Sequence, residues 1–304
     1  MSSPKVSVCI ITYNHGEYIS QCLESVLSQQ TDFDFEIIVG DDFSIDNTRE
    51  ILLDYKKKYP SLVKLIFQEK NTGGTRNYLD VHEAALGQYV AHLDGDDLML
   101  PSKLQFQSDC LDSNSDVSFA VHAVRYIGKN GVKSTEQEYP VKGTILDLLK
   151  LGAYFVHSSV MYRKKYEFAH PTNVDLVDYY FYIERATKGN IYLDKNVLGC
   201  YRIHGQGLSK NAESRARVEK CYETAFDRAI ELGVPLREVQ QARMWRRMAF
   251  AYRRFLDGDI RGFKQKVKLE KADMKFASLQ HKILHYLRFF PAVVGLYARY
   301  KGAL

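Results

Sequence analysis

Cysteine is scarce in this sequence of 304 residues, and it shows no paired spacing. None of the five cysteines belongs to a C-x-x-C motif, so the sequence offers no cysteine-based zinc site or redox pair. Four of the five lie in apolar or amphipathic runs, which predicts free, buried thiols. His82, His92, His122, His157 and His170 form no H-x-x-x-H pair, and each is expected to be a core or surface histidine rather than a metal ligand. The five cysteines are Cys9, Cys22, Cys110, Cys200 and Cys221.

Long apolar runs are absent as well. Crossing a bilayer takes about 18 or more consecutive apolar residues, and the sequence has no such run. The start, Met1-Ser2-Ser3-Pro4-Lys5, lacks the apolar stretch that follows the basic segment of a secretion signal. These absences predict a cytoplasmic protein without a signal peptide. There is no internal repeat or low-complexity tract, and 45% hydrophobic with 26% charged residues predicts a folded globular chain.

Charge is unevenly distributed along the chain. The net charge is +5, yet residues 1–210 contain 22 Lys and Arg against 27 Asp and Glu, whereas residues 211–304 contain 20 against 10. The first part is therefore at −5 and the second at +10, which indicates different partners for the two parts. We predict a first domain over residues 1–210 and a basic, amphipathic helical region over residues 211–304.

Four short apolar runs have the composition of buried parallel strands, because they are rich in β-branched residues and apolar on both faces. Amphipathic helices are predicted between them, at residues 19–27, 46–55 and 75–85. This alternation predicts an α/β, Rossmann-like fold with a mostly parallel central sheet and helices on both faces. Further strands are predicted at 119–124, 158–162 and 191–203, and a helix at 176–187. The four runs are residues 6–11, 35–39, 63–67 and 89–93.

Each of the four runs is followed by a polar cluster. In open parallel sheets, ligands bind beyond the carboxyl ends of the strands. The polar clusters fall at those ends, so we predict that they form one ligand site. The clusters are residues 12–16, 41–46, 71–76 and 94–97.

The last cluster, Asp94-Gly95-Asp96-Asp97, places three carboxylates within four residues. Crowded carboxylates repel one another, and a divalent cation relieves the repulsion. A hard cation such as Mg²⁺ or Mn²⁺ would also leave positions open for diphosphate oxygens. The alternative is a solvated Asp-Gly turn, but the position at a strand end favours the metal site.

The other strand ends carry groups suited to a nucleotide. Asp41 and Asp42 either cap the next helix or accept hydrogen bonds from a ligand such as a uracil N–H, and Asp46 is the better cap by position. Thr12 and Tyr13 offer a hydroxyl and a stacking face. Arg76 offers a charged donor to phosphate.

Four segments together resemble, in order and spacing, the family 2 glycosyltransferases with the GT-A fold, of the bacterial surface-polysaccharide type. The resemblance covers about residues 4–210. Two later segments resemble the family's acidic pair with its aromatic helix and its closing Tyr-Arg-x-His segment: VDYYFYI (177–183) and YRIH (201–204). The first four are VSVCIITYN (6–14), GDDFSIDNT (40–48), NTGGTRN (71–77) and LDGDDL (93–98).

The resemblance implies roles for particular residues. Asp178 falls where the family keeps its general base, although Val177 replaces the first acid of the usual pair; Asp175 is the alternative base. The implied ligands of the cofactor, Mn²⁺ or Mg²⁺, are Asp96, Asp94 and His204. The implied nucleotide-binding residues are Thr12, Tyr13, Asn14, Asp41, Asp42, Asn71, Arg76, Asp94 and Gly95.

The implied reaction is an inverting transfer of a sugar from a nucleotide-diphosphate donor, expected to be a UDP-sugar, to a saccharide acceptor. A lipid-linked oligosaccharide in surface polysaccharide biosynthesis is the expected acceptor. Basic and apolar residues alternate in the C-terminal region, which predicts peripheral contact of residues 280–304 with the inner face of the cell membrane. The alternative for this region is a helical cap that packs on the catalytic domain.

Two other classes of protein remain as alternatives. A sugar nucleotidyltransferase also uses an α/β sheet and a carboxylate-bound metal, but the sequence has no early Gly-rich triphosphate loop carrying Lys or Arg. A non-enzymatic module could bind lipid or nucleic acid through the basic region. The acidic first 210 residues argue against that as the whole function, and we predict no nucleic-acid partner.

Overall fold

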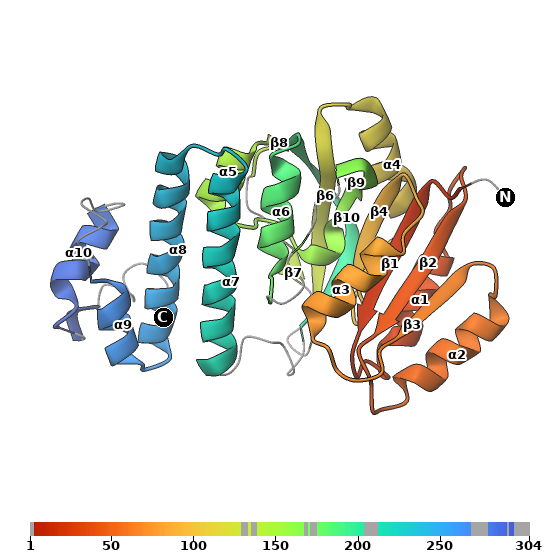
Figure 1. Ribbon diagram of the computed structural model, residues 1–304, viewed down its shortest axis with the longest axis horizontal. Helices are drawn as coiled ribbons and strands as arrows, with labels where there is room; N and C mark the ends of the chain where they lie inside the picture. The colour runs from red at the N-terminus through yellow and green to blue at the C-terminus, as the bar shows by residue number, and fades with distance from the viewer. Residues whose placement is uncertain are drawn as a thin grey trace. The chain divides into compact units, whose positions relative to one another are not determined.

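The computed structural model describes residues 3–128, 133–134, 139–166, 170, 175–203, 212–268, 279–290 and 292–294 (Figure 1). The chain divides into two compact units. The first consists of residues 1–148 and 153–228, and the second of residues 149–152 and 229–304. Each unit is described by itself.

The first unit is built on one mixed sheet, shown in Figure 1, in which four neighbouring strands are parallel. Register pairs Thr12 with Asp41 and Ile11 with Asp94, so three strands end at the same edge. The mostly parallel α/β sheet predicted from the sequence is therefore confirmed for this half. In sheet order, the parallel strands are β3 (Val63–Phe67), β2 (Phe35–Asp41), β1 (Val6–Thr12) and β4 (Tyr89–Asp94).

The sheet continues beyond β4 with strands of mixed length and direction. β9 (Met161–Arg163) is antiparallel to both of its neighbours, β4 and β6, whereas β6 and β10 are parallel to each other. The register of β6 and β10 shifts at three points, as at β-bulges. The remaining strands are β5 (Leu98–Met99), β6 (Val117–Gly128), β7 (Lys133–Ser134), β8 (Lys142–Gly143) and β10 (Asn190–Ile203).

Helices cover both faces of the sheet, as predicted. α1 (Ile19–Leu27) buries Ile19, Leu23 and Val26, whose helical spacing places them on one side, against the core that holds Val8. On the opposite face, the Cys9 thiol donates to the Val81 carbonyl of α3. The other helices of this unit are α2 (Thr48–Lys58), α3 (Gly74–Glu83), α4 (Lys103–Ser113), α5 (Ile145–Leu151), α6 (Asp178–Ala186) and α7 (Ala212–Glu231); α5 and α7 each cross the division between the units.

Two helices differ from the prediction. α2 begins at Thr48 with Asn47 at its N-cap, so the predicted cap, Asp46, lies one residue before the observed one. Asp46 accepts hydrogen bonds from the Thr48 N–H (3.0 Å) and hydroxyl (2.5 Å). α4 was not predicted at all. Its buried side includes the polar residues Lys103, Gln107 and Ser108, which obscure the apolar periodicity.

The second unit is helical in its described part. Its small core consists of Met248, Ala251, Phe263, Val267 and Val294. None of the helices in the described ranges combines the length and apolar character needed to cross a membrane. The helices are α8 (Leu236–Leu256), α9 (Ile260–Lys266) and α10 (Leu279–Leu287).

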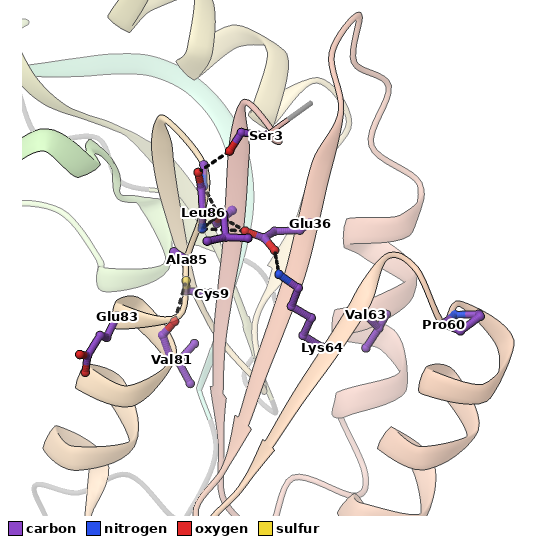
Figure 2. Close-up of polar contacts among 12 residues, drawn as sticks. Ser3, Cys9, Glu36, Pro60, Val63, Lys64, Val81, Glu83, Ala85 and Leu86 are labelled. Atoms are coloured by element: carbon purple, nitrogen blue, oxygen red, sulfur yellow. Dashed lines mark hydrogen bonds and ion pairs between the residues drawn. The ribbon is translucent and has the colours of Figure 1, made fainter. Parts of the chain in front are cut away.

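A buried carboxylate joins several elements at the edge of the sheet opposite to the polar clusters. Glu36 of β2 accepts hydrogen bonds from the Ser7 hydroxyl (2.6 Å), the Lys64 ammonium (2.6 Å) and the Leu86 N–H (2.8 Å). Figure 2 shows the carboxylate between Lys64 and Leu86. Burial acts to raise the pKa of Glu36, but its bonds to Lys64, Ser7 and Leu86 outweigh burial and lower the pKa. The contact therefore favours the ionised form.

We expect Glu36→Gln to lower the free energy of unfolding at pH 7 by about 1–3 kcal/mol, because it weakens these bonds at a buried site. The pKa of Glu36 in the folded state lies below the usual value of 4.5. The ionised carboxylate therefore stabilises the fold above pH 4.5, and this contribution is lost as the pH falls through the folded-state pKa. Urea unfolding at pH 7 and at pH 3 measures both effects: the difference between variant and parent should shrink at pH 3. Glu69→Gln, at an exposed position, is the control. Equal stability of parent and Glu36→Gln at pH 7 would contradict the prediction.

Candidate active site

The turn after β4 lies against the end of β1. The Gly95 N–H donates to the Ile11 carbonyl (2.9 Å). A Cβ atom at Gly95 would lie 2.8 Å from Oγ1 of Thr12, so only glycine permits this approach. Thr12 is buried, and its hydroxyl has no hydrogen-bond partner among the described residues. The carboxylates on either side of Gly95 are thereby held at the end of β1.

The three carboxylates of this turn have different surroundings. Asp97 is buried and accepts hydrogen bonds from the Ser158 hydroxyl (2.5 Å) and the Arg202 N–H (2.8 Å). Asp94 Oδ1 lies 3.2 Å from Nε2 of His92, and Asp96 Oδ2 lies 4.0 Å from Nε2 of His15. Asp97 is therefore engaged in holding the turn, and Asp94 and Asp96 each lie near a histidine.

Negative charge accumulates at this turn. Burial, together with the charges of Asp96 and Asp178, raises the pKa of Asp94 to about 6, while His157 acts to lower it. Burial and the neighbouring carboxylates raise the pKa of Asp97 well above its usual range. Among the described residues, no group of three or more His, Cys, Asp or Glu side chains is arranged to hold a metal ion. Three carboxylates gathered in one turn still make this a place where a cation would be stabilised.

The end of β2 is held by Asp41. Its carboxylate is buried and accepts hydrogen bonds from the Ser44 N–H (3.1 Å) and from Nε of Arg49. The Arg49 guanidinium in turn lies between the rings of Phe43 and Phe67, 5.1 and 4.9 Å from their centroids. The structure thus places Asp41 beneath the site as a support for the loop that follows it.

Asp42 connects the end of β2 to the loop before α3. One carboxylate oxygen accepts from the Thr72 N–H (2.7 Å) and hydroxyl (2.9 Å), and the other from the Gly73 N–H (2.9 Å). Asp42 therefore orders the loop that leads to Arg76. Arg76 forms an ion pair with Asp80 on the same helix (2.5 Å). Asn71, also predicted to bind the nucleotide, is exposed and makes no hydrogen bond among the described residues.

The residues after β1 complete this side of the site. Asn14 has a positive φ of 55°, which asparagine tolerates better than most residues. Its N–H donates to the Ser44 hydroxyl (2.8 Å), and its side-chain oxygen accepts from the Ile45 N–H (2.9 Å). Asn14 thus joins the first two loops, while the neighbouring Tyr13 is 42% exposed and presents its ring to solvent.

Asp178 reaches the same region from α6, of which it is the first residue. Thr75 exchanges hydrogen bonds with the backbone of Leu176 (3.0 and 3.1 Å), which fixes the segment before α6 beside the loop that begins α3. The Asp178 side chain is 55% exposed. Asp175, the alternative base, is directed instead to Arg217 at 3.8 Å. His204 lies outside the described residues.

Sequence reasoning missed several residues that shape this site. Ser158 and Arg202 hold Asp97, and the buried Lys103 donates to the Ser158 carbonyl (2.9 Å). Burial lowers the pKa of Lys103 to about 7, although Asp97 acts to raise it. The TYN and YRIH segments pointed to the neighbourhoods of His15 and Arg202, but nothing in the sequence indicated that Lys103 would lie behind the carboxylates.

Comparison with known proteins identifies the class. The sequence model of glycosyl transferase family 2 matches residues 7–169, so the chain belongs to glycosyl transferase family 2. An uncharacterized glycosyltransferase of Nostoc sp. is 30% identical over 256 residues, which cover 75% of this chain and 77% of that protein. An uncharacterized protein of Mycobacterium tuberculosis is 33% identical over 225 residues; the match covers 72% of this chain and 64% of that protein's length.

Solved structures show the same fold. TarS 1–349 of S. aureus in complex with UDP-GlcNAc is 20% identical, with a TM-score of 0.64 over 98% of this chain and 88% of that one. The mannosyltransferase PcManGT of Pyrobaculum calidifontis, in complex with GDP-Man and Mn²⁺, is 15% identical, with a TM-score of 0.56 over 97% and 87%. The predicted GT-A architecture is therefore confirmed.

We expect Asp42→Ala to increase amide hydrogen exchange at Thr72 and Gly73 by roughly 10- to 100-fold, since bonds to a charged acceptor contribute about 1.5–3 kcal/mol each. Exchange measured by NMR or mass spectrometry checks this. Asp42→Asn, which keeps one acceptor oxygen, should give a smaller increase, and Asp54→Ala on the exposed side of α2 should give none. Unaltered exchange at both amides in Asp42→Ala would refute the role assigned to Asp42.

Proposed function

We propose that this protein is an inverting glycosyltransferase that moves a sugar from a UDP-sugar to a hydroxyl of a saccharide acceptor. The observation that carries the proposal is the meeting of two sets of carboxylates. Asp94 ends the parallel strand β4, and Asp96 lies just after it. Asp178 begins α6, and the segment before α6 is hydrogen-bonded to the start of α3. Membership of glycosyl transferase family 2 supports this activity, and the similar fold of TarS, solved with UDP-GlcNAc, supports a UDP-sugar donor.

In this proposal the three loops at the carboxyl ends of β1, β2 and β3 bind the nucleotide. Tyr13 stacks on the base, and the unpartnered hydroxyl of Thr12 accepts or donates a hydrogen bond. Asp42 retains capacity to accept a further hydrogen bond, because a carboxylate has about four acceptor sites and three are in use. Arg76 is 47% exposed. When the donor binds, its guanidinium leaves Asp80 and binds a phosphate oxygen. The remaining proposed nucleotide-binding residues are Asn14, Asp41, Asn71, Asp94 and Gly95.

In this proposal Asp94 and Asp96 would hold Mn²⁺ or Mg²⁺ together with the donor diphosphate. The residues present fit such an ion, because hard cations bind through one or two carboxylates together with substrate phosphates, and a cation relieves the repulsion among gathered carboxylates. When bound, the cation neutralises charge that develops on the leaving diphosphate. His204, outside the described residues, stays a proposed ligand.

Asp178 is the proposed general base. Its exposed carboxylate takes the proton of the acceptor hydroxyl as that oxygen attacks the anomeric carbon and the bond to the diphosphate breaks. A base in this role accelerates the reaction by roughly 10²- to 10⁴-fold. One displacement inverts the anomeric centre, so an α-linked donor gives a β-linked product.

The acceptor is proposed to be a lipid-linked saccharide of surface polysaccharide biosynthesis, met at the inner face of the membrane. Tyr286, Phe289 and Phe290 are about 60% exposed, at 60%, 61% and 60%. The Arg288 guanidinium lies 4.3 Å from the centroid of Phe289. Exposed rings with a neighbouring cation suit the interface of an anionic bilayer. The segment of residues 286–290, with its exposed rings and Arg288, supports peripheral membrane contact.

We expect UDP to bind the protein in the presence of Mn²⁺, and we expect both EDTA and Asp96→Ala to weaken binding by at least about 10-fold, or 1.4 kcal/mol. Calorimetry measures the dissociation constants, with Asp109→Ala on α4 as the exposed control. Binding that ignores EDTA would refute the cation site. If UDP, GDP and the other nucleoside diphosphates all fail to bind, the glycosyltransferase proposal itself is wrong.

The membrane proposal predicts that replacing Tyr286, Phe289 and Phe290 together with Ser reduces binding to anionic liposomes by at least about 10-fold, because fully burying one such ring contributes about 1.5–3 kcal/mol. Flotation on a density gradient measures the bound fraction. Replacement of Leu53 and Leu86, exposed apolar residues of the first unit, is the matched control. Undiminished flotation of the triple variant would exclude this segment as the contact.

A further inference from the structure

Two buried histidines stand between the carboxylates of the site. His92 lies on β4, and His157 begins the short helix η1 (His157–Ser159). Their rings are 3.8 Å apart between centroids. Nε2 of His92 faces Asp94 at 3.2 Å, and Nε2 of His157 faces Asp178 at 3.9 Å. One ring thus lies behind the proposed donor-side carboxylate and the other behind the proposed base.

The tautomer of His157 follows from its other nitrogen. Nδ1 lies 2.6 Å from the hydroxyl of Tyr182, one turn along α6 from Asp178. Tyr182 is buried, and within the described residues its hydroxyl has no other hydrogen-bond partner. Burial also raises the pKa of this phenol well above 10, so the phenol stays protonated and its O–H donates a hydrogen bond to Nδ1. The ring hydrogen of neutral His157 must then be on Nε2, directed at Asp178.

The surroundings keep this ring neutral and fixed. Burial lowers the pKa of His157 to about 4, although Asp178 acts to raise it. The neighbouring His92 ring is also held in place, because its Nδ1 lies 2.9 Å from Nε2 of His82. Nδ1 of His82 in turn lies 2.8 Å from the Tyr162 hydroxyl. Neither imidazole can turn without breaking a buried hydrogen bond.

We propose that His157 is a positioning residue that orients the Asp178 carboxylate through its Nε2–H. The inference rests on the proposed role of Asp178 as the base. An exposed aspartate at the start of a helix can adopt several rotamers, and a single donor on a rigid ring selects one of them. The 3.9 Å separation is longer than a hydrogen bond, but catalytic hydrogen bonds commonly tighten in the reacting complex.

The first test reads the tautomer directly. In ¹⁵N NMR, the protonated and bare nitrogens of a neutral imidazole give separate resonances, and the His157 signals are assigned by their loss in His157→Gln. We expect the Nε2–H form in the parent protein and a mixture of tautomers in Tyr182→Phe. A parent ring protonated on Nδ1, or on both nitrogens at pH 7, would overturn the proposal whatever the reaction is.

The second test follows turnover, using release of UDP from whichever UDP-sugar the parent protein hydrolyses fastest, with water as the acceptor. We expect His157→Phe to lower kcat roughly 10- to 100-fold, as loss of an orienting partner does. His157→Gln, which keeps an N–H donor, should retain most of the rate, and UDP affinity should not change in either variant. His122→Phe is the matched control, because His122 is another buried, neutral histidine.

Asp178→Asn separates this inference from the proposed function. A large loss with Asp178→Asn but none with His157→Phe would overturn the positioning role and leave the base in place. An unchanged rate in Asp178→Asn would refute the base itself. If His157→Gln is as slow as His157→Phe, or if both weaken UDP binding, the histidine is a packing residue and the inference is wrong.

Discussion

The constraint on which the site depends is the burial of several carboxylates at one edge of a parallel sheet. Strands β1, β2 and β4 end together, so their acidic turns are brought close to one another. Like charges in a poorly solvated place are costly unless each has a donor or a cation nearby. Asp97 meets Ser158 and Arg202, and Asp41 meets Arg49. These hydrogen bonds and the ion pair offset the cost of burying Asp97 and Asp41.

The same acidic and polar side chains also join the loops to one another. Asn14 binds the loop after β2, Asp42 binds the loop before α3, and Thr75 binds the segment before α6. Each of these bonds runs from a side chain to backbone groups, which fixes a loop without an extended strand. Together they form a continuous series of contacts from the proposed nucleotide side to the proposed acceptor side. We therefore expect a change in one loop to alter the hydrogen bonds of the next.

The four parallel strands and the helices between them could be predicted from the sequence, because apolar content and periodicity are local properties. The cap of α2 was placed one residue too early, at Asp46 instead of Asn47, although Asp46 does bind the Thr48 hydroxyl. α4 was missed because Lys103, Gln107 and Ser108 are buried, against their usual preference. The burial of Lys103 and Gln107 is stabilised by distant backbone carbonyls, those of Ser158 and Ser159, which no local pattern reveals.

The sequence by itself determined the order of the strands along the chain and the places where acidic and polar residues follow them. This was sufficient to predict the fold class and the sheet edge at which these residues gather. Only the tertiary structure decided which carboxylates are occupied by structural bonds. Asp97 is held by residues 61 and 105 positions away, Ser158 and Arg202. His157 likewise meets Tyr182, 25 positions along the chain. A hydrogen bond depends on distance and direction in space, and neither is encoded in the local periodicity of a sequence.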